Sequence, residues 1–349
     1  MSILTEKKHI KVLIVDDSDV VCKLFARQLS CDESIQVVGT APDPYVARDK
    51  IISLRPDVLT LDIEMPRMDG LTFLKKLMKH HPMPVIIVSS LTRKGCDIAL
   101  EAIECGAVDV LCKPANSAEV VNLTRDLIDK IKAASKTQLK HVRLRSYRSE
   151  TKTLLKFKSN SNKILAIGAS TGGVTALTTI LQTMPVETPG TVIVQHMPEK
   201  FTASFADRLN KICAIEVKEA EDGDLVIPGR AIIAPGGMHM LLRKIGNRYN
   251  VQLRDGPRVF HQKPSVEVLF QSVAQVAGAN AVGAILTGMG ADGARGLLLM
   301  RNAGAHTIAQ DEASCTVFGM PKEAIAMGAA EKIVPLDRVA MNLLNFAAY

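Results

Sequence analysis

Short apolar runs recur along the first half of the chain, and each one stops at a polar residue. These runs cover residues 11–15, 58–61, 85–88 and 108–112. Between them, residues 70–80 and 95–105 space their apolar positions as a helix does. Strands that alternate with helices predict a parallel, doubly wound sheet. The residues that follow such strands meet at one edge of the sheet, because all the strands point the same way.

The second half of the chain repeats this pattern. Apolar runs occupy residues 163–167, 191–195 and 281–286, and a helical pattern runs from about residue 173 to residue 184. A length of 349 residues suits two domains better than one. The sequence therefore predicts an α/β protein with two doubly wound, mostly parallel-sheet domains joined by a linker.

The distribution of charged residues along the chain indicates where the linker lies. Between Arg125 and Lys163 the chain has twelve Lys or Arg residues and only three acids, a net charge of +9 in a chain whose total is +7. The rest of the chain is therefore slightly acidic. Residues 137–162 also carry Ser and Thr clusters without apolar periodicity, which favours a solvated linker over a patch for nucleic acid or an acidic partner. We expect a first domain at 1–131, a basic flexible linker at 132–160 and a second domain at 161–349.

Composition narrows the class of protein. The N-terminus lacks the features of a signal peptide, and no apolar run approaches the roughly 20 residues that span a bilayer. The seven cysteines are scattered without C-x-x-C spacing, as core residues of a reducing compartment would be. We expect a cytoplasmic protein that does not insert into a membrane.

The strand ends of the first half collect an acidic cluster. Asp16 and Asp17 follow the first run, Asp62 the second, Ser89 the third and Lys113 the fourth. Three carboxylates held close together repel one another unless a cation intervenes, and their hard oxygens suit Mg²⁺. A carboxylate can also accept a phosphoryl group, whose charge the ammonium would neutralise while the hydroxyl donates to it. The alternative is that acids at strand ends cap helices, as Asp17 or Ser18 could.

Residues 9–131 resemble the receiver domain of two-component response regulators, which has a flavodoxin-like fold. The matching motifs are Asp16-Asp17, Asp62, Met65-Pro-Arg-Met-Asp-Gly70, Ser89 and Lys113-Pro114. The resemblance implies that Asp62 is the phosphoacceptor, supported by Ser89 and Lys113, and that Mg²⁺ is the cofactor. Its metal ligands would be Asp17, Asp62, the backbone carbonyl of Glu64, and Asp16 through water. It also implies a cis Lys113–Pro114 bond. Val110 stands near the place where many receivers have an aromatic switch residue.

A second set of polar residues marks the strand ends of the second half. The segment Gly168-Ala-Ser-Thr-Gly172 is a G-x-S-x-G turn between a strand and a helix, which exposes the hydroxyl of Ser170. His196 follows the next run, and Asp292 follows a third. If these strands are neighbours, they bring together a nucleophile, a base and a carboxylate that orients the base. The backbone N–H groups of Met289 and Thr171 would then be oxyanion donors.

Other interpretations of these residues are open. A glycine-rich turn after a strand can cradle a dinucleotide pyrophosphate, but that site expects an acid after the second strand, where this chain has His196. A lone histidine is more often a core or surface residue, as His239, His261 and His306 look to be. The order Ser, His, Asp also differs from the Ser, Asp, His order of common α/β-hydrolases.

Residues 164–344 resemble the catalytic domain of the bacterial chemotaxis protein-glutamate methylesterases, the CheB family. The motifs that carry the resemblance are Gly168-Ala-Ser-Thr-Gly-Gly173, Gln195-His-Met-Pro198, Ala234-Pro-Gly-Gly237 with His239-Met240, Lys263-Pro-Ser-Val266, Leu286-Thr-Gly-Met-Gly290 with Asp292-Gly293, and Ala309-Gln-Asp-Glu-Ala-Ser314. Glu267 stands where the family usually has Asp. The resemblance implies a Rossmann-like serine hydrolase with Ser170, His196 and Asp292 as catalytic residues and no cofactor for the esterase chemistry.

The resemblance also implies a biological setting. The substrates would be methyl-accepting chemotaxis receptors, whose glutamyl methyl esters are hydrolysed and some of whose glutamines are deamidated. The phosphodonor would be a chemotaxis histidine kinase, and the unphosphorylated receiver would cover the esterase cleft. We expect a monomer without a nucleic-acid partner. A response regulator that binds DNA through the basic linker would need a helix-turn-helix, of which no pattern appears; a scaffold with a dead esterase site conflicts with the intact Ser170, His196 and Asp292.

Overall fold

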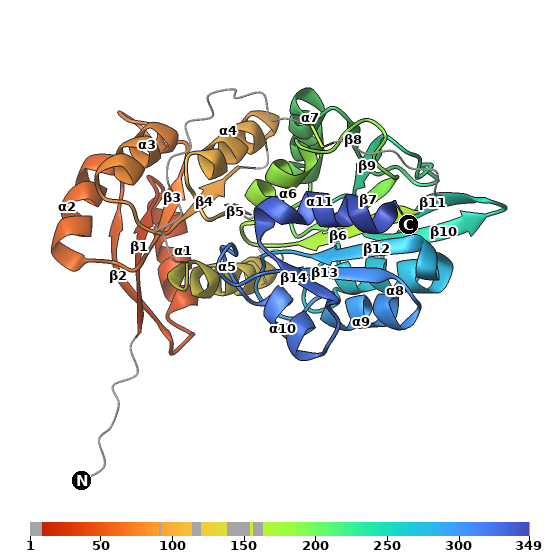
Figure 1. The fold of residues 1–349 in the computed structure, drawn as a ribbon. Helices are drawn as coiled ribbons and strands as arrows, with labels where there is room; N and C mark the ends of the chain where they lie inside the picture. Colours follow the sequence, from red (N-terminus) through yellow and green to blue (C-terminus); the bar gives the residue numbers. More distant parts are fainter. Residues whose placement is uncertain (1–8, 91, 114–119, 138–153, 156–162, 349) are drawn as a thin grey trace, which may run out of the picture. The chain divides into compact units, whose positions relative to one another are not determined.

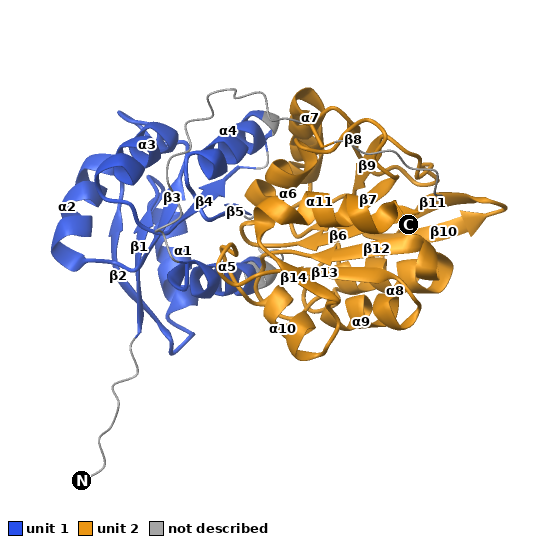
Figure 2. Ribbon diagram, in the orientation of Figure 1, with its two compact units in different colours: residues 1–146 blue, residues 147–349 orange. Residues whose placement is uncertain are grey.

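The computed structural model describes residues 9–90, 92–113, 120–137, 154–155 and 163–348. Two compact units divide the chain, residues 1–146 and 147–349 (Figure 2). Pro114 and most of the predicted linker, 132–160, lie outside the described residues. Helix α5 continues to Ser135, past the expected end of the first domain at 131, so part of the segment assigned to the linker is helical.

The first unit is a five-stranded sheet in the order β2-β1-β3-β4-β5 with all neighbours parallel (Figure 1). This order is the flavodoxin-like one. Its strands are β1 (Ile10–Val15), β2 (Ile35–Ala41), β3 (Val58–Asp62), β4 (Val85–Ser89) and β5 (Asp109–Cys112). Its helices are α1 (Asp19–Leu29), α2 (Pro44–Leu54), α3 (Gly70–His80), α4 (Arg93–Glu104) and α5 (Val120–Ser135).

Burial explains which strands the pattern predicted in the first unit. All residues of β3 and β4 are buried, and the last four residues of β1 are too. The edge strand β2 buries only its first and last residues, Ile35 and Ala41, so its sequence carries no long apolar run. One core packs α1 and α5 against β1 and β4 around Phe25 and Leu127. The predicted parallel sheet is confirmed, and β2 is the strand that the apolar runs missed.

The second unit has a seven-stranded parallel sheet in the order β14-β13-β12-β6-β7-β9-β8. Helices α6, α7 and α11 lie on one face and α8, α9 and α10 on the other (Figure 1). The strands are β6 (Ile164–Ala169), β7 (Thr191–Gln195), β8 (Glu216–Glu219), β9 (Arg230–Ile233), β12 (Ala281–Ile285), β13 (His306–Gln310) and β14 (Lys332–Val334). The helices are α6 (Gly173–Leu181), α7 (Phe201–Ile212), α8 (Val266–Val276), α9 (Ala294–Asn302), α10 (Met320–Ala326) and α11 (Leu336–Ala347).

An antiparallel hairpin interrupts the parallel pattern between β9 and α8. It consists of β10 (His239–Ile245) and β11 (Arg248–Arg254), and β10 packs against α8. A 3-10 turn, η2 (Gly278–Asn280), joins α8 to β12. The bond between Lys263 and Pro264, just before α8, is cis. The hairpin therefore leads the chain back to the start of α8, which lies beside the site described below.

The structure bears on two expectations drawn from composition, which concern membrane-spanning segments and the cysteines. Every described helix falls short of the length and apolarity that crossing a bilayer requires. All seven cysteines lie in the described part of the chain and none is in a disulfide. The interpretation of the cysteines as core residues is right for Cys22 and Cys96, which are buried, and wrong for Cys31, which is exposed.

Close packing of β6 against α8 generates a testable prediction. A Cβ at Gly168 would lie 2.2 Å from Cγ1 of Val266, whose β-branched side chain has little freedom to move. Gly168→Ala should therefore lower the free energy of unfolding of the second unit by about 1–3 kcal/mol. The measurement is the urea midpoint of that unit's transition.

The matched control is Gly283→Ala on the neighbouring strand. There the added Cβ would meet only the flexible ends of Leu297 and Met300, both at 2.8 Å. We expect a smaller loss for this variant. If both variants lose the same free energy of unfolding, the contact between Gly168 and Val266 is no more rigid than the contact of Gly283 with flexible side chains.

Candidate functional site

Ser170 lies at the tip of a tight turn between β6 and α6. The Gly173 N–H donates to the Ser170 carbonyl at 2.7 Å, which closes the turn. Gly172 has a φ of 79° at the N-cap of α6, a left-handed conformation that glycine adopts without strain. The Ser170 side chain is nearly buried at the carboxyl edge of the sheet, with 9% of the residue exposed. The predicted strand–turn–helix context is therefore present.

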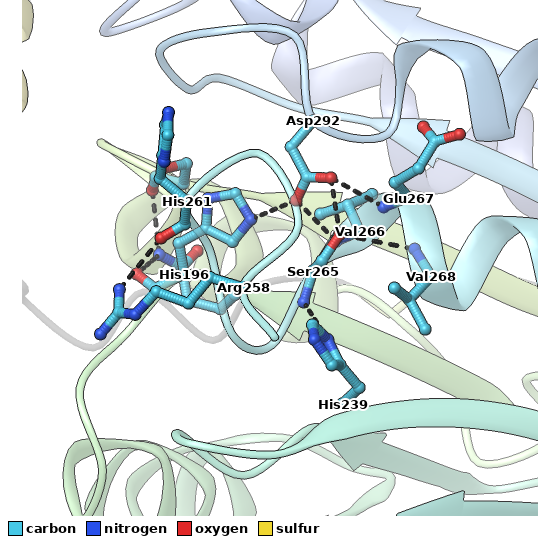
Figure 3. A network of polar contacts seen from close by, with 11 residues as sticks. His196, His239, Arg258, His261, Ser265, Val266, Glu267, Val268 and Asp292 are labelled. Carbon is cyan, nitrogen blue, oxygen red and sulfur yellow. Dashed lines mark hydrogen bonds and ion pairs between the residues drawn. The ribbon is translucent and has the colours of Figure 1, made fainter. Parts of the chain in front are cut away.

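His196 and Asp292 are in direct contact. Nε2 of His196 lies 2.7 Å from Oδ2 of Asp292, and both residues are buried (Figure 3). A carboxylate can only accept, so Nε2 carries the hydrogen. Nδ1 of His196 is buried and has no hydrogen-bond partner among the described residues. In a neutral imidazole with Nε2–H, Nδ1 carries the lone pair. The ring therefore presents a base through Nδ1.

Strand order explains where this contact lies. Strand β6, which ends just before Ser170, separates β7 from β12, and His196 follows β7 while Asp292 lies beyond β12. The His196–Asp292 contact therefore bridges the strand that carries the serine. The His196 N–H donates to the carbonyl of Ala169 at 3.1 Å, which ties the base to the residue before the serine. No hydrogen bond joins the Ser170 hydroxyl to the imidazole among the described residues.

Four donors surround the Asp292 carboxylate. Oδ1 accepts from the Ser265 hydroxyl at 2.7 Å and from the Glu267 N–H at 2.9 Å. Oδ2 accepts from the Val266 N–H at 2.8 Å in addition to His196. Burial alone would raise the pKa of Asp292, but the hydrogen bonds outweigh it, so this pKa lies below its ordinary value. The carboxylate stays ionised at the N-terminus of α8, where helix N–H groups favour negative charge.

The loop after β12 lies against the serine turn. The Ser170 N–H donates to the Thr287 carbonyl at 3.0 Å. A Cβ at Gly288 would lie 2.6 Å from Cβ of Ser170, so the next residue, Met289, is close to the nucleophile. The Met289 N–H makes no hydrogen bond to any described residue, so it is available for the predicted role of oxyanion donor. The oxyanion roles of Met289 and Thr171 stay predictions.

Three polar residues that the sequence did not single out contact this site. The Gln195 amide nitrogen donates to the carbonyls of Ser170 at 2.9 Å and of His196 at 3.1 Å. Ser265 caps α8 and donates to Asp292, and its own N–H donates to Nδ1 of His239 at 3.2 Å. Gln195, Ser265 and His239 all lay inside family-like motifs, which was the available signal.

Glu267 also has a structural role that sequence reasoning did not assign. Its Oε2 accepts from the Gly296 N–H at 2.8 Å, in the first turn of α9. Asp292, just before α9, accepts from the N-terminus of α8. The two helix N-termini therefore each bind a carboxylate supplied by the other segment, which fixes α8 and α9 together.

The first unit contains the predicted acidic cluster. Carboxylate oxygens of Asp16, Asp17 and Asp62 lie within 4.8 Å of one another. Nζ of Lys113 lies 2.9 Å from Oδ2 of Asp16 and 2.8 Å from Oδ2 of Asp62. Ser18, and not Asp17, caps α1, so the helix-cap alternative does not account for these acids. Three carboxylates against one ammonium leave a negative site that fits a divalent cation.

The surroundings shift the pKa of two residues in this cluster. Burial raises the pKa of Asp62 above its ordinary value, against the opposing effect of Lys113. Burial works to lower the pKa of Lys113, but its bonds to Asp62 and Asp16 outweigh this and leave the pKa raised. The Ser89 hydroxyl donates to the Gly95 carbonyl at 3.3 Å. The side chain of Glu64 is exposed and accepts from Ser90 at 3.3 Å, which leaves the role of its carbonyl a prediction.

Two family models match the chain. The model described as CheB methylesterase matches residues 165–343, and the model of the response regulator receiver domain matches residues 12–125. A solved structure of the Thermotoga maritima CheB methylesterase catalytic domain superposes with a TM-score of 0.52 at 38% identity, covering 53% of this chain and 98% of that one.

Full-length relatives match across both units. A protein-glutamate methylesterase/protein-glutamine glutaminase of Syntrophus aciditrophicus is 57% identical over 96% of this chain and 98% of its own length. A protein of the same name from Pectobacterium atrosepticum is 51% identical, covering 96% of each chain. The similarity therefore includes the order of the two domains.

The lowered pKa of Asp292 predicts a pH dependence. Because the pKa of Asp292 is lower in the folded state, the ionised carboxylate stabilises the fold fully above its unfolded-state pKa of about 3.9. This stabilisation is lost as the pH falls through the lower pKa of the folded state. Asp292→Asn should therefore lower the free energy of unfolding both at about pH 7 and at about pH 5, because the wild-type carboxylate is ionised at both. The difference from wild type should shrink only below about pH 4. Urea unfolding of the second unit measures it, and a difference that already shrinks above pH 5 would indicate a raised pKa.

Proposed function

Because the chain belongs to the CheB methylesterase family, we propose that it is a phosphorylation-regulated protein-glutamate methylesterase and protein-glutamine glutaminase acting on chemoreceptors. The observation that carries the proposal is the buried His196–Asp292 pair with its unpartnered Nδ1, at the sheet edge where Ser170 lies. The protein would act in the cytoplasm as a monomer, without a nucleic-acid partner.

The esterase reaction uses the atoms of this site in two steps. The Ser170 hydroxyl attacks the side-chain acyl carbon of a glutamyl methyl ester while Nδ1 of His196 takes its proton. Nε2–H stays bonded to Asp292, which stabilises the imidazolium. The imidazolium then gives the proton to the leaving methoxide, or to the leaving amide nitrogen of a glutamine. Water, deprotonated by the same nitrogen, releases glutamate and restores the serine.

Two parts of the site account for the rate. A positioned base contributes roughly 10²–10⁴-fold. One oxyanion donor, here the Met289 N–H with Thr171 as second candidate, contributes roughly 10²–10³-fold. No cofactor enters these steps, because nucleophile, base and oxyanion donors are all supplied by the chain.

The receiver unit would control this reaction through Asp62. Asp17, Asp62 and the Glu64 carbonyl would hold Mg²⁺, with Asp16 acting through water, and the ion supplies neutralisation of phosphoryl charge. A chemotaxis histidine kinase is the proposed phosphodonor. Lys113 would pair with the phosphoryl group, and the Ser89 hydroxyl would turn from the Gly95 carbonyl to donate to it. The unphosphorylated receiver would restrain the esterase, and phosphorylation would release it.

The nucleophile is tested by Ser170→Ala. Without the hydroxyl no acyl-enzyme can form, so release of labelled methanol from methylated receptor membranes should fall by at least about 10³-fold. Thr175→Ala, on the exposed side of α6, is the control and should keep wild-type activity. A folded Ser170→Ala variant that still releases methanol would rule out Ser170 as nucleophile.

Regulation is tested with a small phosphodonor and Mg²⁺. Methanol release by the full chain should rise when both are added, and Asp62→Asn should abolish the rise while keeping the basal rate. Asp57→Asn, which alters a carboxylate that binds the Lys11 N–H away from the cluster, is the matched control.

A fragment that begins near residue 160 lacks the receiver, so it should release methanol faster than the unphosphorylated full chain. If the fragment and the unphosphorylated chain have equal rates, the receiver is not inhibitory.

A further inference from the structure

We propose that Ser265 and His239 are positioning residues that hold Asp292 in the geometry that His196 requires. The inference rests on the proposed function, because it concerns the base of the same site. Ser265 is fully buried and His239 is 5% exposed, and neither side chain contacts Ser170 or His196 through a described hydrogen bond. Figure 3 shows the line of contacts from His239 through Ser265 and Asp292 to His196.

Ser265 occupies one oxygen of the carboxylate. Its hydroxyl donates to Oδ1 of Asp292 at 2.7 Å and accepts the Val268 N–H at 3.4 Å, so one group caps α8 and binds the acid. With the Glu267 N–H it fills Oδ1, and Oδ2 is left to Val266 and His196. Two donors on each oxygen fix the plane of the carboxylate, which fixes the direction of the imidazole.

His239 holds Ser265 in turn. Nε2 of His239 lies 2.9 Å from the Pro257 carbonyl, which can only accept, so Nε2 carries the hydrogen. Nδ1 is then the acceptor for the Ser265 N–H at 3.2 Å. Both contacts are satisfied by the neutral Nε2–H tautomer alone. The imidazole therefore links the segment after β11 to the start of α8 and sets the position from which Ser265 reaches Asp292.

The chain offers a matched control on the same helix. Ser272 is also buried, and its hydroxyl likewise donates one hydrogen bond and accepts one backbone N–H. It donates to the Leu269 carbonyl at 2.6 Å, where Ser265 donates to a carboxylate, and it accepts from the Leu242 N–H at 2.8 Å. It has no hydrogen bond to Asp292. Ser272→Ala therefore reproduces the loss of a buried serine hydroxyl without touching the acid.

The experiment compares Ser265→Ala, Ser265→Thr and Ser272→Ala in the full chain. A hydrogen bond to a charged group corresponds to about a tenfold to hundredfold effect, so kcat of Ser265→Ala should fall by that factor with KM nearly unchanged. Ser265→Thr keeps the hydroxyl and should restore most of the kcat. Ser272→Ala should lose stability but keep its kcat. Equal kcat values for Ser265→Ala and Ser272→Ala would overturn the proposal.

A second variant and a second measurement keep the proposal testable if Ser265→Ala does not fold. Ser265→Gly retains much of the helix cap and lacks the hydroxyl. His239→Phe fills the space of the ring without its nitrogens, and should lower kcat in the same direction. In nitrogen-15 spectra of the histidine rings, the His196 Nε2–H signal should move in Ser265→Gly and stay in Ser272→Ala. An unmoved signal in Ser265→Gly would also overturn the proposal.

Two substrates separate this inference from the proposed function. Hydrolysis of p-nitrophenyl acetate reports on Ser170 and its base whatever the natural substrate is, and methylated receptor membranes report on the proposed substrate. If wild type cleaves only the small ester, the proposed substrate is wrong while the Ser265 comparison still stands. If wild type cleaves both and the Ser265 variants match Ser272→Ala, only the positioning role fails.

Discussion

The site of the second unit depends on keeping one carboxylate ionised inside the protein. Moving a charge out of water is costly unless hydrogen bonds replace the lost solvation. Asp292 obtains them from the N-terminus of α8, the Ser265 hydroxyl and His196, and its pKa falls below the ordinary value despite burial. This requirement places α8 against the strand ends, and Gly168 allows that approach because a side chain there would overlap Val266.

The two units use buried aspartates in opposite ways. Asp62 has Lys113 beside it, and burial still raises its pKa, so its carboxylate is more basic than an ordinary one. Greater basicity would suit Asp62 in its proposed role as phosphoacceptor. Asp292 has four donors and a lowered pKa, which suits a group that must stay charged while its neighbour takes a proton.

The sequence predicted four of the five strands of the first sheet and three of the seven strands of the second, because parallel strands buried on both faces read as continuous apolar runs. Strands β2, β8 and β14 and the β10–β11 hairpin were missed because they are partly exposed. Strands β9 and β13 were missed although they are buried beyond their first residues. The chemistry-bearing residues Ser170, His196 and Asp292 were predicted because they follow strands or glycine turns. Ser265 and His239 were not, because their contacts depend on how the hairpin returns to α8, which no local pattern encodes. His239, for example, was interpreted as a core or surface histidine with no role in the site.

Strand order places the proposed base and acid on either side of the proposed nucleophile, and the three follow one another along the chain as Ser, His, Asp. The serine strand β6 is central, with the base strand β7 on one side and the acid strand β12 on the other. Two strand spacings, about 10 Å, separate β7 from β12, so base and acid can meet only by reaching across the end of β6. The long loop after β12 supplies that reach, and α8 receives its carboxylate. The contact that orients the imidazole is thereby made over the turn that holds Ser170.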